Sequence, residues 1–416
     1  MGKKIFHIFL VFNLIFAPVY PLIENGIVLS LILSIVYLMR SRQALKVTNN
    51  LFRDKYVITV LLIPFVIIVS IIIIAVMHGT KLEIEYVGNY IGLVAVALSS
   101  YLVSAIVYIQ NGKRVTYVID LILVCFSIQT IIIILAQVSP AVLKFVQLFQ
   151  SDALLHLDRE PLFRRLLLSS AGFYGIGLVY GLTYILLAHK IIITKKVSLG
   201  DFLNFCLLFI GNMYTARTGF VGLLFALFYI VMKRVGGYFK FKLLIKSVLL
   251  LIVFVIVGMY ILPKNIINMK VLNFAFEMFM NDKLETGSSN GLKTMWDRDV
   301  PISTFFVGDG IMYNKDGSYY MHTDVGYLRN IFFGGIFFFF FFFFLQVYII
   351  ACPLYRSENK RLLLVTLILY LLALHVKGEA IMFSRVLLSE MYLFLFVMYY
   401  DTKGLKSNKI IKNDEH

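Results

Sequence analysis

Long apolar runs recur along the whole 416-residue chain, and they constrain its fold more than any other feature. Hydrophobic residues make up 60% of the sequence and charged residues only 15%. A helix needs about 20 apolar residues to cross the roughly 30 Å hydrocarbon core of a bilayer, and several runs reach that length. Backbone polar groups inside a bilayer must bond within their own segment, so each run is predicted to be a helix. The sequence therefore predicts an all-α, polytopic integral membrane protein with a single membrane domain over residues 1–416.

The apolar runs predict about twelve membrane-spanning helices. They cover residues 5–20, 24–39, 57–78, 87–110, 115–139, 166–188, 198–214, 218–232, 243–262, 329–351, 362–376 and 380–400. The first two runs are short and meet around residues 21–26, so they form either a tight hairpin or one span. The uninterrupted Phe337–Phe344 run points around the whole helix, which predicts lipid-facing side chains rather than a binding stripe.

The net charge of +16 is distributed unevenly between the loops. If the N-terminus is cytoplasmic, lysine and arginine concentrate in the cytoplasmic loops, and the outer loops are almost balanced. This is the positive-inside bias of membrane proteins, so the excess charge needs no nucleic-acid partner. The bias predicts two cytoplasmic termini and a large outward-facing loop over residues 263–328. The three cysteines lie in or beside apolar runs, which argues against a disulfide framework or a Cys-based zinc site.

Several cations are expected at the outward-facing ends of the predicted spans, where charge is costly and often functional. Arg217 occupies a very short turn between two short spans. Two interpretations stay open for it: contact with lipid headgroups as an interfacial side chain, or a planar clamp on a phosphate. For Arg385 the alternative to phosphate binding is an ion pair with Glu390 or contact with the outer interface. The outward cations that we predict to assist in binding a pyrophosphate are Arg159, Arg164, Arg165, Arg329 and Arg385.

The end of the large loop brings His322 and Asp324 directly before an apolar run. A histidine and a carboxylate at this spacing are suited to accepting the proton of a hydroxyl group. The alternative is that both residues cap the start of the next helix. Asp297 and Asp299 have the spacing of an Asp-x-Asp metal site, but two carboxylates at that spacing are common, and no metal site is predicted. The sequence contains neither a P-loop nor a dinucleotide fingerprint, so no cofactor is expected.

Three short motifs, in their order and placement, resemble the O-antigen polymerase (Wzy) family of bacterial inner membranes. They are Thr-Ala-Arg-Thr-Gly-Phe at 215–220, His-Thr-Asp-Val-Gly-Tyr-Leu-Arg-Asn-Ile-Phe-Phe-Gly at 322–334, and Lys-Gly-Glu at 377–379. The layout, with one large loop before the last three spans, extends the resemblance over nearly the full chain. The related O-antigen ligases share a histidine followed by a leucine and a glycine entering a span. His322, Leu328 and Gly334 fit that pattern loosely.

The resemblance implies a multi-pass glycosyltransferase of the bacterial inner (plasma) membrane. Such an enzyme transfers a growing glycan from undecaprenyl pyrophosphate to a new undecaprenyl-pyrophosphate-linked repeat unit at the periplasmic face. Its expected partners are that lipid-linked oligosaccharide, the lipid bilayer and a separate chain-length regulator. In this mechanism Arg217, with the other outward arginines, binds the donor pyrophosphate, and His322 or Asp324 accepts the proton of the attacking hydroxyl.

The sequence is also compatible with other functions. An O-antigen ligase or a capsular or exopolysaccharide polymerase would use the same kind of donor. A flippase for lipid-linked oligosaccharides, which is a transporter, would also have about twelve spans. Against a flippase stand the single long outer loop and the lack of evident pseudo-symmetry between the halves of the chain.

Overall fold

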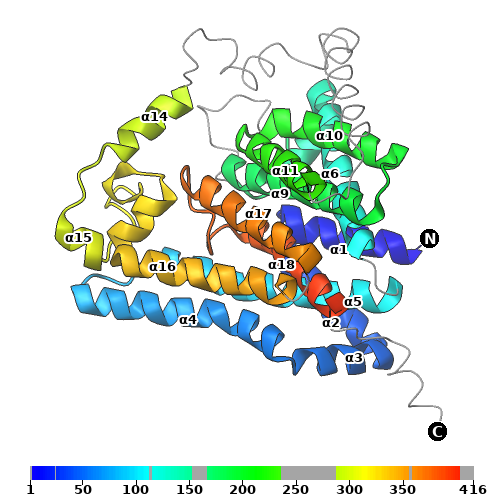
Figure 1. The fold of residues 1–416 in the computed structure, drawn as a ribbon, viewed down its shortest axis with the longest axis horizontal. Coiled ribbons are helices and arrows are strands. Elements are labelled where there is room, and N and C mark those ends of the chain that lie inside the picture. The colour runs from blue at the N-terminus through cyan, green and yellow to red at the C-terminus, as the bar shows by residue number, and fades with distance from the viewer. Residues whose placement is uncertain are drawn as a thin grey trace. The chain divides into compact units, whose positions relative to one another are not determined.

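The structure is a computed structural model that describes residues 2–23, 25–111, 115–151, 166–235, 287–355 and 358–402. Within these ranges the regular structure is helical, apart from two isolated β-bridges (Figure 1). Five of the described helices are long and apolar enough to cross a membrane: α4 (Lys55–His78), α5 (Ile84–Asn111), α6 (Val115–Val138), α9 (Phe173–Thr194) and α16 (Gly326–Leu354). The all-α class is therefore confirmed. The full set of about twelve spans and their orientation stay predictions.

Shorter helices account for most of the other predicted spans. They are α1 (Gly2–Phe16), α2 (Gly26–Arg40), α10 (Leu199–Thr215), α11 (Thr218–Val235), α17 (Glu358–His375) and α18 (Arg385–Thr402). Four further helices lie in segments that the sequence assigns to loops or to loop edges: α3 (Arg42–Phe52), α7 (Pro140–Gln147), α14 (Gly287–Trp296) and α15 (Ile302–Val307). The predicted span 243–262 and the first part of the large loop lie outside the described residues.

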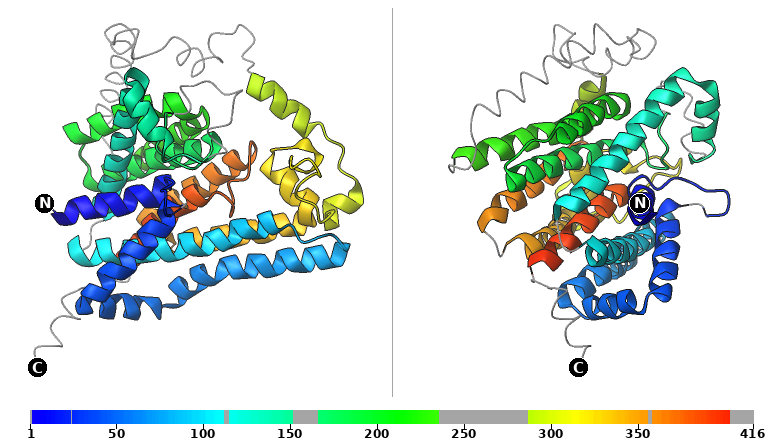
Figure 2. Two further views of the ribbon diagram at one scale, coloured as in Figure 1. Left: turned by 180° about the vertical axis from the view of Figure 1, so that it is seen from behind. Right: turned by 90° about the vertical axis from the view of Figure 1, so that its right-hand side faces the viewer.

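The chain divides into two compact units, and each is described by itself. Unit 1 comprises residues 1–29 and 116–284, and unit 2 comprises residues 30–115 and 285–416. In unit 1, α9 packs against α10 and α11. In unit 2, α4 packs against α5 and α16, while α18 packs against α5 and α16 (Figures 1 and 2). The prediction of a single membrane domain remains a prediction.

Glycines allow α9 and α11 of unit 1 to approach closely. A Cβ atom added at Gly222 would collide with the backbone of Gly181, and one added at Gly177 would lie 3.3 Å from Cβ of Thr218, the first residue of α11. Helices in membranes associate through such small residues because lipid offers no hydrophobic driving force between them. These glycines therefore set the spacing of the helix pair.

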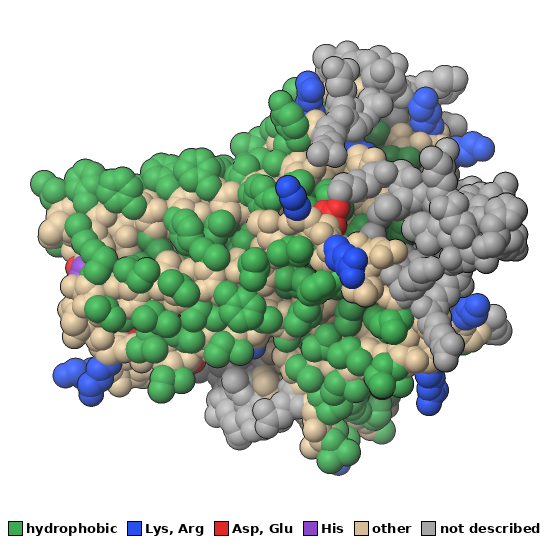
Figure 3. All heavy atoms as spheres, turned by 90° about the horizontal axis from the view of Figure 1, so that it is seen from below, with side chains coloured by type: hydrophobic (Ala, Val, Ile, Leu, Met, Phe, Trp, Pro, Cys, Tyr) green, Lys and Arg blue, Asp and Glu red, His purple; other side chains and the backbone are tan. Residues whose placement is uncertain are grey.

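Helix α4 of unit 2 carries a broad apolar surface that its own unit does not cover. Val69, Val76 and Met77 are 55%, 76% and 69% exposed, whereas Val60 and Ile67 on the opposite side are fully buried. Hydrophobic side chains cover much of the face drawn in Figure 3, with few lysines or arginines among them. This distribution fits a helix in contact with lipid on one side.

The phenylalanine run in α16 does not face lipid throughout, which corrects the expectation from the sequence. Phe338, Phe339 and Phe342 are buried. Phe342 lies against Tyr90 of α5, with ring centroids 5.9 Å apart. Phe337, by contrast, is 70% exposed. A run of one residue type around a helix cannot encode which side will meet neighbouring helices, so packing alone divides it into core and surface.

Candidate functional site

A break in α16 anchors the loop that precedes it. Gly334 and Gly335 leave the helical conformation, with φ/ψ of −134°/18° and 72°/−177°. The break frees the carbonyl oxygens of Phe332 and Phe333 from the helix ladder. They instead accept hydrogen bonds from the backbone N–H groups of Asp309 (2.7 Å) and Gly310 (2.9 Å). Hydrogen bonds between the two backbones thus hold the loop against the helix.

The short connection between α4 and α5 holds the same loop from another side. The carboxylate of Glu83 accepts hydrogen bonds from the backbone N–H groups of Met312 (2.8 Å) and Tyr313 (3.2 Å). Burial raises the pKa of Glu83, while these two hydrogen bonds act in the opposite direction. The Thr80 hydroxyl donates to the carbonyl of Gly310 at 3.1 Å. Residues 309–313 are therefore fixed by partners on α16 and on the connection between α4 and α5.

Beyond these anchors the chain forms a tight hairpin that carries a pocket. Tyr313 and Tyr319 pair in an antiparallel β-bridge, and Gly317 takes a positive φ of 78° in the turn between them. The pocket has a volume of about 390 Å³. It is lined by Glu85, Tyr313, Gly317, Ser318, Tyr319, His322 and Asp324. The structure thus brings the two predicted proton acceptors, His322 and Asp324, to one pocket.

Hydrogen bonds in the hairpin determine which ring nitrogen of His322 carries a proton. The Ser318 hydroxyl lies 2.6 Å from Asp316 Oδ1, and an ionised carboxylate only accepts hydrogen bonds, so the hydroxyl donates to it. The Ser318 oxygen must then accept from His322 Nδ1, 3.1 Å away. We assign the proton to Nδ1 from this network, which leaves Nε2 of a neutral His322 as an acceptor. The bonds from Ser318 also hold the pKa of Asp316 below its usual value.

The backbone around His322 is strained. Met321 and His322 have φ angles of 55° and 49°, in the left-handed region. A non-glycine residue there costs of the order of 1–3 kcal/mol, and such strain persists where the surrounding structure imposes it. Here the hydrophobic contacts of Tyr320 and Met321 with Val325, Leu328 and Phe332 hold the segment in place.

Arg329 lies beneath the pocket rather than at an exposed rim. Its side chain is 4% exposed, and its amino nitrogen lies 2.9 Å from Glu379 Oε2. Its guanidinium carbon is 3.5 Å from the centre of the Tyr319 ring, a cation–π contact. Arg329 Nε and both Glu379 oxygens lack hydrogen-bond geometry to any partner among the described residues, so charge rather than directed bonding joins the pair. In this arrangement Arg329 supports the pocket from below.

The other predicted cations have separate environments. Arg385 donates hydrogen bonds to the backbone carbonyls of Gly88 (3.0 Å) and Asn89 (3.3 Å) on α5. Arg217 is half-buried in the turn between α10 and α11 of unit 1. Arg159, Arg164 and Arg165 lie outside the described residues. Among the residues that the structure describes, Asp297 and Asp299 belong to no cluster of three or more metal-ligating side chains.

Several pocket residues were not among the sequence candidates. Tyr313, Ser318 and Tyr319 carry no local signal, because a tyrosine or a serine in a loop is ordinary. Glu85 precedes an apolar run far from the large loop in the sequence, so no spacing connects it with His322. Glu379 lies in the Lys-Gly-Glu motif at 377–379, but no sequence pattern indicates a function for it. Its partner Arg329 is 50 positions earlier in the chain, and only the fold brings the two together.

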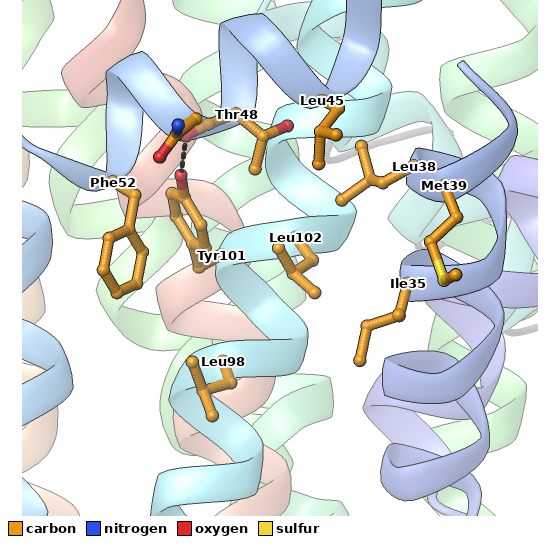
Figure 4. A pocket seen from close by; sticks show the side chains of 10 residues that line it. Ile35, Leu38, Met39, Leu45, Thr48, Phe52, Leu98, Tyr101 and Leu102 are labelled. Carbon is orange, nitrogen blue, oxygen red and sulfur yellow. Dashed lines mark hydrogen bonds between the residues drawn. The ribbon is translucent and has the colours of Figure 1, made fainter. Parts of the chain in front are cut away.

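A second pocket in unit 2 is of a different kind. It has a volume of about 410 Å³ and lies between α2, α3 and α5 (Figure 4). None of its ten lining residues is charged, and the hydroxyl of Tyr101 is bonded to the carbonyl of Thr48 at 2.5 Å. It offers no group for acid–base chemistry, so the hairpin pocket is the candidate site.

Comparison of the chain with models of protein families finds no match. Curated proteins and solved structures likewise give none.

Proposed function

We propose that this protein is a membrane glycosyltransferase that polymerises O-antigen repeat units. It transfers a growing glycan from undecaprenyl pyrophosphate to a new lipid-linked repeat unit at the periplasmic face of a bacterial inner membrane. One observation carries the proposal: the pocket that brings His322 and Asp324 together with Glu85 and two tyrosines. The motif resemblance and the five helices that are long and apolar enough to cross a membrane support it.

The reaction forms one glycosidic bond and breaks one bond to phosphate. A hydroxyl of the acceptor sugar attacks the anomeric carbon of the donor glycan. The bond from that carbon to the pyrophosphate oxygen breaks, and undecaprenyl pyrophosphate leaves with the electron pair. The hydroxyl proton passes to Nε2 of His322 or to the carboxylate of Asp324, both of which line the pocket. The leaving pyrophosphate is stabilised by cations, a role that the proposal gives to Arg217.

The test is lipopolysaccharide electrophoresis of a strain that lacks the gene. We expect single-repeat lipopolysaccharide in the deletion strain and a full ladder after complementation with the wild-type chain. His322→Ala should lower polymer synthesis by about 100-fold or more, the range for loss of a general base. Asp324→Asn tests the alternative proton acceptor.

Lys315→Ala is the matched control, because Lys315 is an exposed charge in the same hairpin that does not line the pocket. Membrane immunoblots confirm equal protein levels for every variant. A core-only band in the deletion strain would overturn polymerisation in favour of ligation or flipping. Full ladders from both His322→Ala and Asp324→Asn would remove the pocket from the chemistry.

A further inference from the structure

We infer that the hairpin pocket is a sugar-binding subsite that accepts an uncharged glycan ring and excludes an anionic one. The inference deepens the proposed function, since it assigns the pocket to the acceptor sugar rather than to the donor pyrophosphate. Its supporting observations are the two tyrosine rings and the charges of the lining residues.

The tyrosine rings give the pocket an aromatic wall. Tyr313 and Tyr319 have ring centroids 5.6 Å apart and planes inclined by 30°. Both side chains are half-buried, so each ring keeps part of its surface open to the pocket. The C–H bonds on one face of a pyranose carry partial positive charge, and aromatic faces carry the negative end of a quadrupole. Sugar rings therefore stack on such walls.

The wall is held rigidly, which lowers the entropic cost of binding. The β-bridge ties the two tyrosine backbones together, and the Glu83 carboxylate holds the N–H of Tyr313. Arg329 lies 3.5 Å from the centre of the Tyr319 ring. Because Arg329 is itself fixed beside Glu379, Tyr319 rests on a buried support rather than on solvent.

The charged groups of the pocket determine what it excludes. Its lining contains two carboxylates, Glu85 and Asp324, and one histidine, His322, with no lysine or arginine. Carboxylates accept hydrogen bonds from sugar hydroxyls and repel anions. A pyrophosphate or a uronic acid would meet two negative groups with no lysine or arginine in the lining to compensate them. A neutral sugar meets two strong acceptors.

The experiment uses the full-length protein in lipid nanodiscs and saturation-transfer NMR. The probes are the methyl glycosides of glucose, galactose, mannose, rhamnose and N-acetylglucosamine, with methyl glucuronide as the anionic match of methyl glucoside. We expect saturation transfer to at least one neutral glycoside and none to the glucuronide. Tyr319→Leu should weaken that binding about tenfold or more, whereas Tyr319→Phe, which keeps the ring, should bind as the wild type does.

Two further variants keep the outcome decisive. Glu85→Gln removes one exposed carboxylate and should admit the glucuronide. Tyr348→Ala removes an exposed tyrosine of α16 outside the pocket and should change nothing. Failure of every neutral glycoside to bind, equal binding of the glucuronide, or unchanged binding by Tyr319→Leu would each overturn the subsite. Because this assay measures binding alone, it can fail while polymerisation succeeds, or succeed where polymerisation fails.

Discussion

At the residue scale, the Arg329–Glu379 pair shows the largest energetic consequence of a single side chain. Both side chains are buried, with 4% and 1% exposure. Removing one partner of a buried pair leaves an uncompensated charge and costs about 3–5 kcal/mol, whereas replacing both by apolar residues is often neutral. We expect Glu379→Ala to lower the free energy of unfolding by that amount, measured by reversible unfolding in mixed micelles.

The control for this prediction is the double variant Arg329→Met with Glu379→Leu, which removes both charges together. It should recover most of the stability lost by Glu379→Ala. If Glu379→Ala unfolds like the wild type, the pair does not stabilise unit 2.

Arg217 poses a second question at the same scale, because headgroup contact and phosphate binding make different demands on it. Two parallel hydrogen bonds to phosphate need the planar guanidinium, whereas contact with headgroups needs only a positive charge. If the proposal is right, Arg217→Ala lowers polymer synthesis by about 100- to 1000-fold, the cost of losing one donor to a developing charge. Arg217→Lys should also be strongly impaired, and the length and amount of the lipopolysaccharide ladder measure both effects.

A ladder of normal length from Arg217→Lys, at equal protein level, would restrict the residue to headgroup contact. A normal ladder from Arg217→Ala would remove it from catalysis altogether.

At the scale of the element, the break in α16 and the loop bound to it each contain a glycine in a conformation that other residues avoid. Gly308 has φ/ψ of 80°/−177° and Gly335 has φ/ψ of 72°/−177°. This region of backbone conformation is essentially restricted to glycine. A Cβ added at Gly335 would also collide with the carbonyl of Phe306. We expect Gly335→Ala to destabilise the loop by well over the roughly 1–3 kcal/mol of backbone strain alone. Hydrogen exchange of the backbone N–H groups of Asp309 and Gly310 measures the effect.

Gly79→Ala provides the matched comparison. Gly79 ends α4 with a φ of 60°, and nothing lies within 4 Å of an added Cβ. Its replacement should cost only about 1–2 kcal/mol of left-handed strain and leave the loop protected. Equal effects of the two substitutions would mean that the close approach at Gly335 contributes nothing.

For the whole molecule, the uneven loop charges predict an orientation that can be measured directly. We expect Lys315→Cys, in the exposed hairpin, to react with a membrane-impermeant maleimide in cells with an opened outer membrane. Lys196→Cys, exposed after α9, should react only once the inner membrane is disrupted. A Cys352→Ser background removes the one native cysteine that is not buried. Labelling of both positions from the same side would contradict the predicted topology.

The molecule also shows how far a sequence specifies a candidate site. The turn signals at 308–310 and the glycines at 334–335 are visible in the sequence, but their backbone hydrogen bonds are not. His322 and Asp324 are recognisable candidates because they adjoin an apolar run. Their companions Tyr313 and Tyr319 lie farther from that run. Glu85 adjoins a different apolar run, more than 200 positions earlier, and nothing in the sequence links it to the large loop.

The sequence by itself determined that apolar helices make up this protein: apolar runs of bilayer length favour helices, and each run that the structure describes contains one. Tertiary structure alone decided which face of each helix is buried, as the divided Phe337–Phe344 run shows. It also decided that Arg329 supports a tyrosine instead of facing outwards. The physical reason is that hydrophobicity is a property of a segment, whereas burial and ion pairing depend on neighbours that are distant in the chain.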